Sequence, residues 1–208
     1  MNASQSQWRG LRARYAAHWF NSRARLKAER GVLDAIRNMI SKDDTVLDLG
    51  AGTGHFTLAV APLLDEGTVV AVDLSPDMLA GLNRHAATRH LSAKIETVVA
   101  DVAETGLPDA SVDVVMSGNV LHELPDPTAA VGEMARVLRP NGQVVIHDFR
   151  DGIVGRIMKL LHHHGAHGAL GMDEIRRYLH AAGFADVEVT SSGVRYLATA
   201  RKNGACAA

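Results

Sequence analysis

Apolar and polar residues alternate along the chain in blocks that predict a series of strands and helices. Short runs rich in apolar residues, bounded by turn residues, predict strands at residues 45–49, 68–73, 94–100, 112–117 and 142–149. Apolar residues three or four positions apart predict helices near 55–64, 76–90 and 127–138. Because buried strands alternate with helices, we expect an α/β fold in which right-handed crossovers build a parallel sheet.

The two ends of the chain add to this alternating core. Residues 172–183 predict a helix that ends at Gly183, and 187–190 with 194–200 predict a closing hairpin. Near the N-terminus, apolar side chains recur at helical spacing, which predicts a segment that packs against the rest of the protein. These side chains are Trp8, Leu11, Tyr15 and Trp19.

A glycine-rich turn separates the first predicted strand from the helix that follows it. Gly50, Gly52 and Gly54 allow positive φ angles and close approach of a ligand to the backbone. Their G-x-G-x-G spacing differs from the dinucleotide fingerprint G-x-G-x-x-G, because His55 stands where the last glycine would be. The turn therefore predicts a nucleotide-like ligand, its spacing weakens the case for a dinucleotide, and a turn without a ligand is the structural alternative.

Acidic residues follow the second and third predicted strands. Asp73 lies 21 residues beyond Gly52, where doubly wound folds place a carboxylate against ribose hydroxyls. A helix cap is the alternative role, although Ser75 before Pro76 already supplies a cap. Asp101 could accept from the amine of an adenine while Val102 packs on the ring. The alternative for Asp101 is a carboxylate that accepts from the backbone of its own loop.

Together these motifs resemble those of class I S-adenosylmethionine-dependent methyltransferases, most closely the small-molecule branch that includes the ubiquinone/menaquinone C-methyltransferases. The resemblance runs from Val46 to Phe149 through VLDLGAGTG, VVAVDLSPDML, VVADVAETGLPDASVDVVMSGNVLHEL and EMARVLRPNGQVVIHDF. It implies a Rossmann-like methyltransferase fold with a doubly wound, seven-stranded sheet, mostly parallel, that ends in an antiparallel hairpin. Asn141 replaces the first glycine of the usual Pro-Gly-Gly, a change that affects a turn.

The resemblance also implies the cofactor, S-adenosyl-L-methionine, and the residues that hold it. Asp48, Gly50, Gly52 and Asn119 would surround the methionine part, Asp73 would bind the ribose, and Asp101 with Val102 would bind the adenine. The predicted cofactor-binding residues are Asp48, Gly50, Ala51, Gly52, Asp73, Leu74, Asp101, Val102 and Asn119. Amides of the turn can receive the carboxylate of the cofactor, and carbonyls with Asp48 can receive its ammonium.

A general base is useful if the acceptor is a hydroxyl, a thiol or an acidic carbon, and histidine suits this role near neutral pH. His122 follows the fourth strand, and His147 precedes Asp148 at the end of the fifth. In similar methyltransferases N-terminal helices form one wall of the substrate pocket, which would add Tyr15 and His18. For each of these candidates, a purely structural role is the alternative.

The resemblance and the length favour one domain, residues 1–208, with an N-terminal helical lid (1–41), a cofactor-binding core (42–150) and a C-terminal lid and closing hairpin (151–208). Four histidines occur in the last of these parts: His162, His163, His164 and His167. Only His163 and His167 have the i, i+4 spacing that converges on one ion, and no cysteine or clustered acid completes a set. We therefore predict no metal site, and a mobile lid or a substrate-facing loop is the alternative use of the segment.

The charge and hydropathy of the chain narrow the class of partner. The net charge is −1 and the pI is about 6.8, which argues against a general attraction to nucleic acid or acidic lipid. Seven basic side chains in residues 1–30 would favour RNA or an anionic substrate locally, but the Asn/Asp-Pro-Pro-aromatic tetrapeptide of base-targeting methyltransferases is absent. The chain has neither an apolar run of about 18 residues nor a secretory signal, so we expect a cytoplasmic protein.

The sequence therefore predicts methyl transfer from S-adenosylmethionine to a small organic acceptor by in-line displacement. Three alternatives remain open at this stage. The protein could bind S-adenosylmethionine as a sensor or scaffold without turnover, act as a nicotinamide-dependent oxidoreductase on a similar fold, or methylate RNA.

Overall fold

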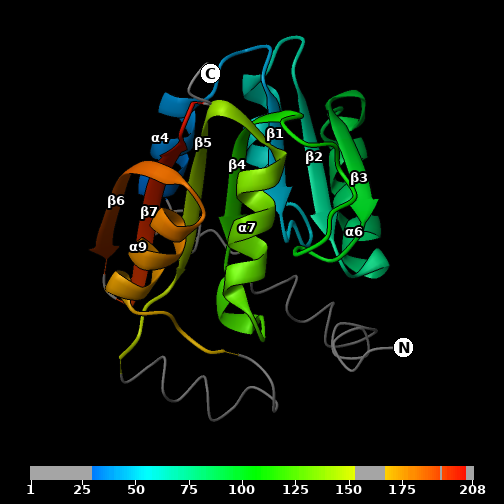
Figure 1. The fold of residues 1–208 in the computed structure, drawn as a ribbon. Helices are drawn as coiled ribbons and strands as arrows, with labels where there is room; N and C mark the ends of the chain where they lie inside the picture. The colour runs from blue at the N-terminus through cyan, green and yellow to red at the C-terminus, as the bar shows by residue number, and fades with distance from the viewer. Residues whose placement is uncertain (1–29, 153–166, 193, 205–208) are drawn as a thin grey trace. The chain divides into compact units, whose positions relative to one another are not determined.

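The computed structural model describes residues 30–152, 167–192 and 194–204 (Figure 1). The chain falls into two compact units, the first ending at Thr105 and the second beginning at Gly106. In the seven-stranded sheet, the first unit contributes strands in the order β3-β2-β1 and the second in the order β4-β5-β7-β6.

The first unit is an alternation of parallel strands and helices. Its elements are α4 (Arg30–Met39), β1 (Thr45–Leu49), α5 (Thr57–Val60), the 3-10 turn η1 (Ala61–Leu63), β2 (Thr68–Asp73), α6 (Pro76–Thr88), the 3-10 turn η2 (Ser92–Lys94) and β3 (Ile95–Val99). Strand β2 pairs in parallel with β1 on one side and with β3 on the other. Helix α5 therefore lies in the crossover between β1 and β2, and α6 lies in the crossover between β2 and β3.

Burial explains why the sequence predicted the first two strands so closely. Val46, Leu47 and Leu49 on β1 are fully buried, as is typical of a parallel strand covered on both faces. Strand β2 is buried in the same way, but β3 is at the edge of the sheet and its Val99 is 58% exposed. Ser75 caps α6 as predicted, because its hydroxyl accepts from the Met78 N–H at 3.3 Å and Pro76 follows it.

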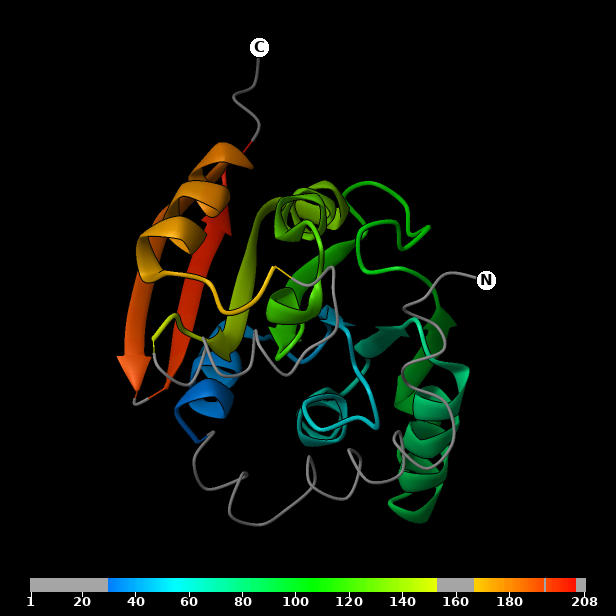
Figure 2. The same ribbon diagram turned by 90° about the horizontal axis from the view of Figure 1, so that it is seen from below.

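The second unit combines one parallel strand pair with an antiparallel hairpin. Its elements are β4 (Val112–Gly118), the 3-10 turn η3 (Leu121–Glu123), α7 (Pro127–Val137), β5 (Leu138–Phe149), α9 (Met172–Ala181), β6 (Phe184–Ser192) and β7 (Arg195–Lys202). Strand β5 runs parallel to β4 and antiparallel to β7, and β6 runs antiparallel to β7. Figures 1 and 2 show α9 packed along β6 and β7. The predicted fold class, a mostly parallel seven-stranded sheet with a C-terminal antiparallel hairpin, is confirmed.

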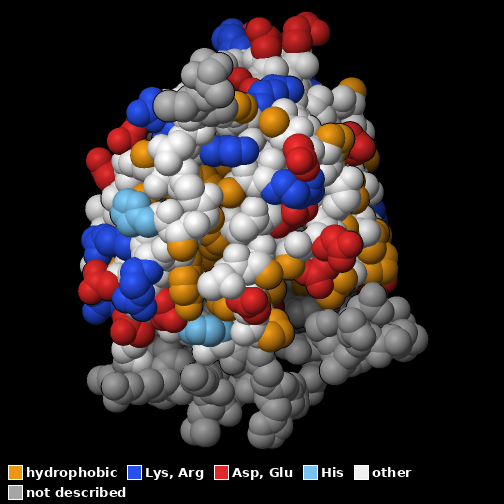
Figure 3. Space-filling model, viewed as in Figure 1, with side chains coloured by type: hydrophobic (Ala, Val, Ile, Leu, Met, Phe, Trp, Pro, Cys, Tyr) orange, Lys and Arg blue, Asp and Glu red, His pale blue; other side chains and the backbone are white. Residues whose placement is uncertain are grey.

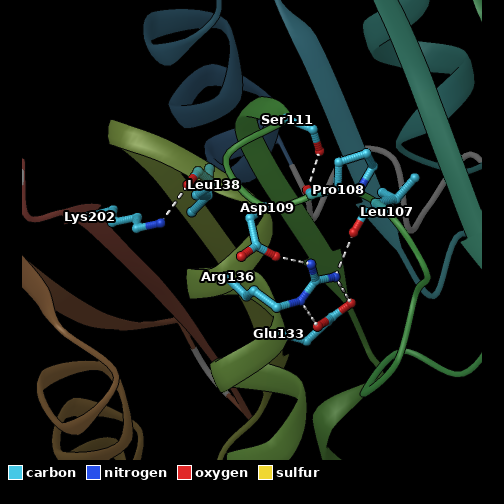
Figure 4. A network of polar contacts seen from close by, with 8 residues as sticks. All are labelled: Leu107, Pro108, Asp109, Ser111, Glu133, Arg136, Leu138 and Lys202. Carbon is cyan, nitrogen blue, oxygen red and sulfur yellow. Dashed lines mark hydrogen bonds and ion pairs between the residues drawn. The ribbon is translucent and has the colours of Figure 1, made fainter.

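A network around Arg136 fixes the loop before β4 to helix α7 (Figure 4). The Arg136 guanidinium donates to both carboxylate oxygens of Glu133, at 2.7 and 2.8 Å, and also to Asp109 and to the carbonyl of Leu107. Glu133 is buried, and these bonds raise the pKa of Arg136. A bidentate guanidinium pair of this kind satisfies a carboxylate that would be costly to bury without a partner. The network is therefore structural.

Some boundaries differ from the sequence prediction. Strand β5 begins at Leu138 instead of 142, and β6 begins at Phe184 instead of 187. Both additions lie beside register shifts, with Asn141 at φ 66° and Asp186 at φ 52°. A bulge of this kind interrupts the alternation from which a strand is predicted, and it disrupts the pairing locally before the pairing resumes beyond it. The N-terminal aromatic stripe lies outside the described residues.

The surface over α7 and α9 carries acidic and basic side chains mixed together, with no large area of one sign (Figure 3). Ion pairs such as Arg176 with Asp173 on α9 account for part of this mixture. Among the helices that the structure describes, none is both long enough and apolar enough to cross a membrane.

Candidate functional site

The glycine turn between β1 and α5 is held to the end of β2 by its own backbone. The N–H groups of Gly50 and Ala51 both donate to the carbonyl of Val72, at 2.8 and 2.9 Å. Gly50, Gly52 and Gly54 have φ angles of 80°, 54° and 87°. The predicted left-handed conformations are therefore confirmed at all three glycines, and any other L-residue would be strained there.

Two of these glycines are required for different reasons. A Cβ added at Gly54 would lie 2.7 Å from a methyl carbon of Leu82 on α6, so this glycine allows the turn to pack against α6. A Cβ added at Gly52 would meet no heavy atom of the residues that the structure describes within 4 Å. Gly52 therefore leaves open space beside the backbone, as the approach of a ligand requires.

Asp48 is a buried carboxylate on β1, directly before the turn. Its Oδ2 accepts from the backbone N–H of Thr57 at 3.0 Å and from the Thr57 hydroxyl at 2.5 Å, at the first residue of α5. Burial raises the pKa of Asp48 to about 6, although the two bonds from Thr57 act in the opposite direction. Both donors therefore reach the same oxygen of this carboxylate.

Asp73 ends β2 beside the same turn. Its Oδ2 accepts from the Gly52 N–H at 2.8 Å, and its Oδ1 accepts from the Ser75 N–H at 2.8 Å. Burial raises the pKa of Asp73, and these two bonds oppose the rise. The carboxylate thus lies at the open side of the turn, where the sequence placed it, and it also has a local structural role.

The remaining predicted cofactor residues of the first unit surround the same strand ends. Ala51 is buried against Ala71 and Leu82. Val102 is buried, whereas Asp101 is exposed and its Oδ1 accepts from the Ala103 N–H at 2.9 Å. This bond is the local contact weighed as the alternative for Asp101, and it leaves Oδ2 for another donor. Leu74 is half-buried.

Asn119 lies in the second unit, immediately after β4. It is buried, has a φ of 61°, and donates its backbone N–H to the carbonyl of His147 at 2.9 Å. Its side-chain oxygen accepts from the Arg195 guanidinium. A contact of Asn119 with the methionine part of a cofactor stays a prediction.

His122 pairs with Asp148 at the carboxyl ends of β4 and β5. Its Nδ1 lies 2.6 Å from Asp148 Oδ1, and its backbone N–H donates to Asp148 Oδ2 at 3.2 Å. Both side chains are buried. Burial acts to lower the pKa of His122, but the charges of Asp148 and Glu123 outweigh burial, so the pKa is raised.

Arg195 and Phe149 adjoin this pair. The Arg195 guanidinium lies over the Phe149 ring, 4.2 Å from its centroid, and the His122 and Phe149 rings form a T-shaped pair with their centroids 5.1 Å apart. Tyr196, the cross-strand partner of Asp148, is fully buried, and the described residues provide no hydrogen-bond partner for its hydroxyl. Asp148, Arg195 and Tyr196 were not among the predicted site residues. Only Asp148 had a signal, a carboxylate at the end of a buried strand.

The other candidate catalytic residues do not take part in the contact between His122 and Asp148. His147 is buried on β5 next to Asp148, and consecutive residues of a strand point to opposite faces. Tyr15 and His18 lie outside the described residues, as do His162, His163 and His164. His167 pairs with Glu174 at 3.4 Å, and the described residues hold no group of three or more metal-ligand side chains.

A family model for a methyltransferase domain matches residues 47–146. The chain is 30% identical over 155 residues to the malonyl-[acyl-carrier protein] O-methyltransferase of Methylococcus capsulatus, which covers 74% of this chain and 55% of that protein. It is 35% identical over 107 residues to the demethylmenaquinone methyltransferase of Bacillus licheniformis, covering 51% of this chain and 45% of that protein. The chain thus spans about half the length of these curated relatives.

The fold has a close counterpart among solved structures. A SAM-dependent methyltransferase from Aquifex aeolicus superposes with a TM-score of 0.71 at 21% identity, over 88% of this chain and 95% of that one. At this identity the likeness concerns the fold alone. With the sequence relatives, it confirms the predicted resemblance to class I methyltransferases and to the quinone C-methyltransferases.

Proposed function

Because the chain carries a class I S-adenosylmethionine-dependent methyltransferase domain, we propose that it transfers the methyl group of this cofactor to a small organic acceptor by in-line displacement. The observation that carries the proposal is the open glycine turn beside Asp73. The turn combines three left-handed glycines, a strand-end carboxylate and free space at Gly52. These features fit an adenosine that bears an amino acid.

The polar and apolar residues around the turn in the first unit divide the binding of this cofactor among them. Asp73 accepts from the ribose hydroxyls, and Asp101 and Val102 bind the adenine. Asp48 lies before the turn and offers Oδ1 to the ammonium, while main-chain amides of the turn receive the carboxylate. S-adenosylmethionine carries no phosphate, so its binding depends more on close contact with the backbone of the turn than on a phosphate-binding helix N-terminus. The G-x-G-x-G spacing agrees with this.

When bound, S-adenosylmethionine supplies a methyl group on a sulfonium sulfur, which is already activated for transfer. The tasks left to the protein are to hold the acceptor in line, to exclude water and to remove a proton where the acceptor carries one. The buried polar residues at the ends of β4 and β5, which include His122 and Asp148, are suited to the last task.

Replacing Asp73 with alanine tests the assignment of the ribose. We expect the affinity for S-adenosylmethionine to fall by about 1.5–3 kcal/mol, the usual range for a hydrogen bond to a charged group. Isothermal titration measures the change, and Asp77→Ala, which removes an exposed carboxylate in the first turn of α6, is the matched control. An unchanged dissociation constant in Asp73→Ala would show that the carboxylate does not bind the ribose and only stabilises the conformation of the turn.

A further inference from the structure

Tyr196 on β7 carries a polar group into the interior of the second unit. Its side chain is fully buried, and within residues 30–152, 167–192 and 194–204 its hydroxyl has no hydrogen-bond partner. Burial of a hydroxyl without a partner is costly, because the group gives up its hydrogen bonds to water. Buried polar groups of folded proteins are therefore nearly always bonded, either to the protein or to an ordered water.

The hydroxyl of Tyr196 is a donor. Burial raises its pKa well above the ordinary value, and the negative charges of Asp148 and Glu174 raise it further. The phenol therefore stays protonated, and the charges that act on it come from two carboxylates, one on β5 and one at the start of α9. Either carboxylate could receive the proton of the hydroxyl in a hydrogen bond.

Glu174 already has donors of its own. Its Oε1 accepts from the Tyr178 hydroxyl at 2.7 Å and lies 3.4 Å from His167 Nε2, and its Oε2 accepts from the Gly171 N–H at 3.3 Å. Its side chain is 26% exposed, so bulk water reaches it as well. Glu174 is therefore satisfied without Tyr196.

Asp148 lies directly opposite Tyr196 in the sheet. The two residues are register partners on the antiparallel strands β5 and β7, so their side chains lie on the same face. Asp148 is 1% exposed, and its Oδ1 is bonded to the His122 ring and accepts from the Phe149 N–H. Its Oδ2 accepts from the His122 N–H. An ionised carboxylate has about four acceptor positions, so these contacts of the described residues leave one position, on Oδ2, for a further donor.

We propose that the second unit binds an internal water molecule, which accepts from the Tyr196 hydroxyl and donates to Asp148 Oδ2. The two side chains share a face of the sheet without a direct hydrogen bond between them. A bridging water supplies the acceptor that the phenol needs and the donor that the carboxylate can take. The site lies wholly within the second unit and does not depend on the proposed function.

A water molecule suits this place better than an ion does. An anion would be repelled by the Asp148 carboxylate, which is buried and therefore weakly screened. A metal ion would lack ligands, because the part of the chain that the structure describes holds no group of three or more histidine, cysteine or acidic side chains that could bind one. Water alone can accept from the phenol and donate to the carboxylate at the same time.

A crystal structure of the full chain tests the site directly. We expect density for one water about 3 Å from both the Tyr196 hydroxyl oxygen and Asp148 Oδ2. A hydroxyl that bonds directly to another side chain would overturn the proposal, and so would a map with no density between the two groups.

Tyr196→Phe supplies an independent test, because it removes the hydroxyl and keeps the ring. If the hydroxyl is bonded to a water, the variant loses that bond, and the unfolding constant from urea denaturation should rise about fivefold. Loss of a hydroxyl that has no partner would leave the constant unchanged or lower it, and either result would refute the proposal. The matched control is Tyr178→Phe, which removes a hydroxyl that donates directly to Glu174 from a half-buried position and should also raise the constant.

Discussion

Gly52→Leu should abolish the binding of S-adenosylmethionine while the protein stays folded. A Cβ added at this position meets no heavy atom of the described residues within 4 Å, so we expect a leucine side chain to project into the space that the cofactor would occupy. We expect the dissociation constant to rise by at least about 100-fold, which corresponds to about 2.7 kcal/mol. Isothermal titration with S-adenosylmethionine measures this change.

The control for this variant is Gly183→Leu. Gly183 follows α9, has a φ of 88° and is also open, with no heavy atom within 4 Å of an added Cβ. A leucine in a left-handed conformation costs about 1–2 kcal/mol at either position, so both variants should lose similar stability. Only Gly52→Leu should lose binding. Normal affinity in Gly52→Leu would mean that the turn does not contact the cofactor.

Asp48 should make the protein less stable as the pH rises from about 4 to 6. The pKa of Asp48 is about 6 in the folded state and 3.8 when unperturbed, so in this window the folded state binds more protons than the unfolded state. Stability is therefore highest below the unperturbed pKa and falls until the folded carboxyl has ionised. The full loss is about 3 kcal/mol, because each pKa unit corresponds to about 1.4 kcal/mol.

Two variants isolate this effect in urea unfolding at several pH values. Asp48→Asn cannot ionise, so its unfolding free energy should change less between pH 4 and 6 than that of the wild type. Thr57→Val removes the hydroxyl that donates to Asp48, which raises the pKa of Asp48 further and moves the loss of stability to higher pH. Parallel pH dependence in the wild type and Asp48→Asn would show that this carboxylate is not the titrating group.

The sequence predicted best where one local rule decides the structure. The bounds of β1 and β2 match the prediction because each is a continuous apolar run that ends at a glycine or an acid. The cap at Ser75 followed from Ser-Pro alone. The glycine turn and the position of Asp73 followed from the order of strand, turn and strand, which the chain itself fixes.

Contacts between residues far apart in the chain could not be predicted in this way. Asp148 is 26 residues beyond His122, and their contact depends on which face of β5 carries the Asp148 side chain. His147 was the predicted candidate at that strand end, and only the folded register shows that Asp148, its neighbour, is the residue that reaches His122. The requirement for glycine at position 54 is similar, because it comes from close packing against Leu82 on α6, which lies far along the chain.

The central claim is that the turn between β1 and α5, with Asp73, holds S-adenosylmethionine. The most direct measurement is a titration of the full chain with S-adenosylhomocysteine, followed by the backbone amide signals of Gly52 and Ser75, which both donate to Asp73. The account predicts that both signals shift and saturate together at one ligand per chain, and that NAD leaves them unmoved. Amides that stay in place while the ligand binds elsewhere, or that respond to NAD alone, would contradict it.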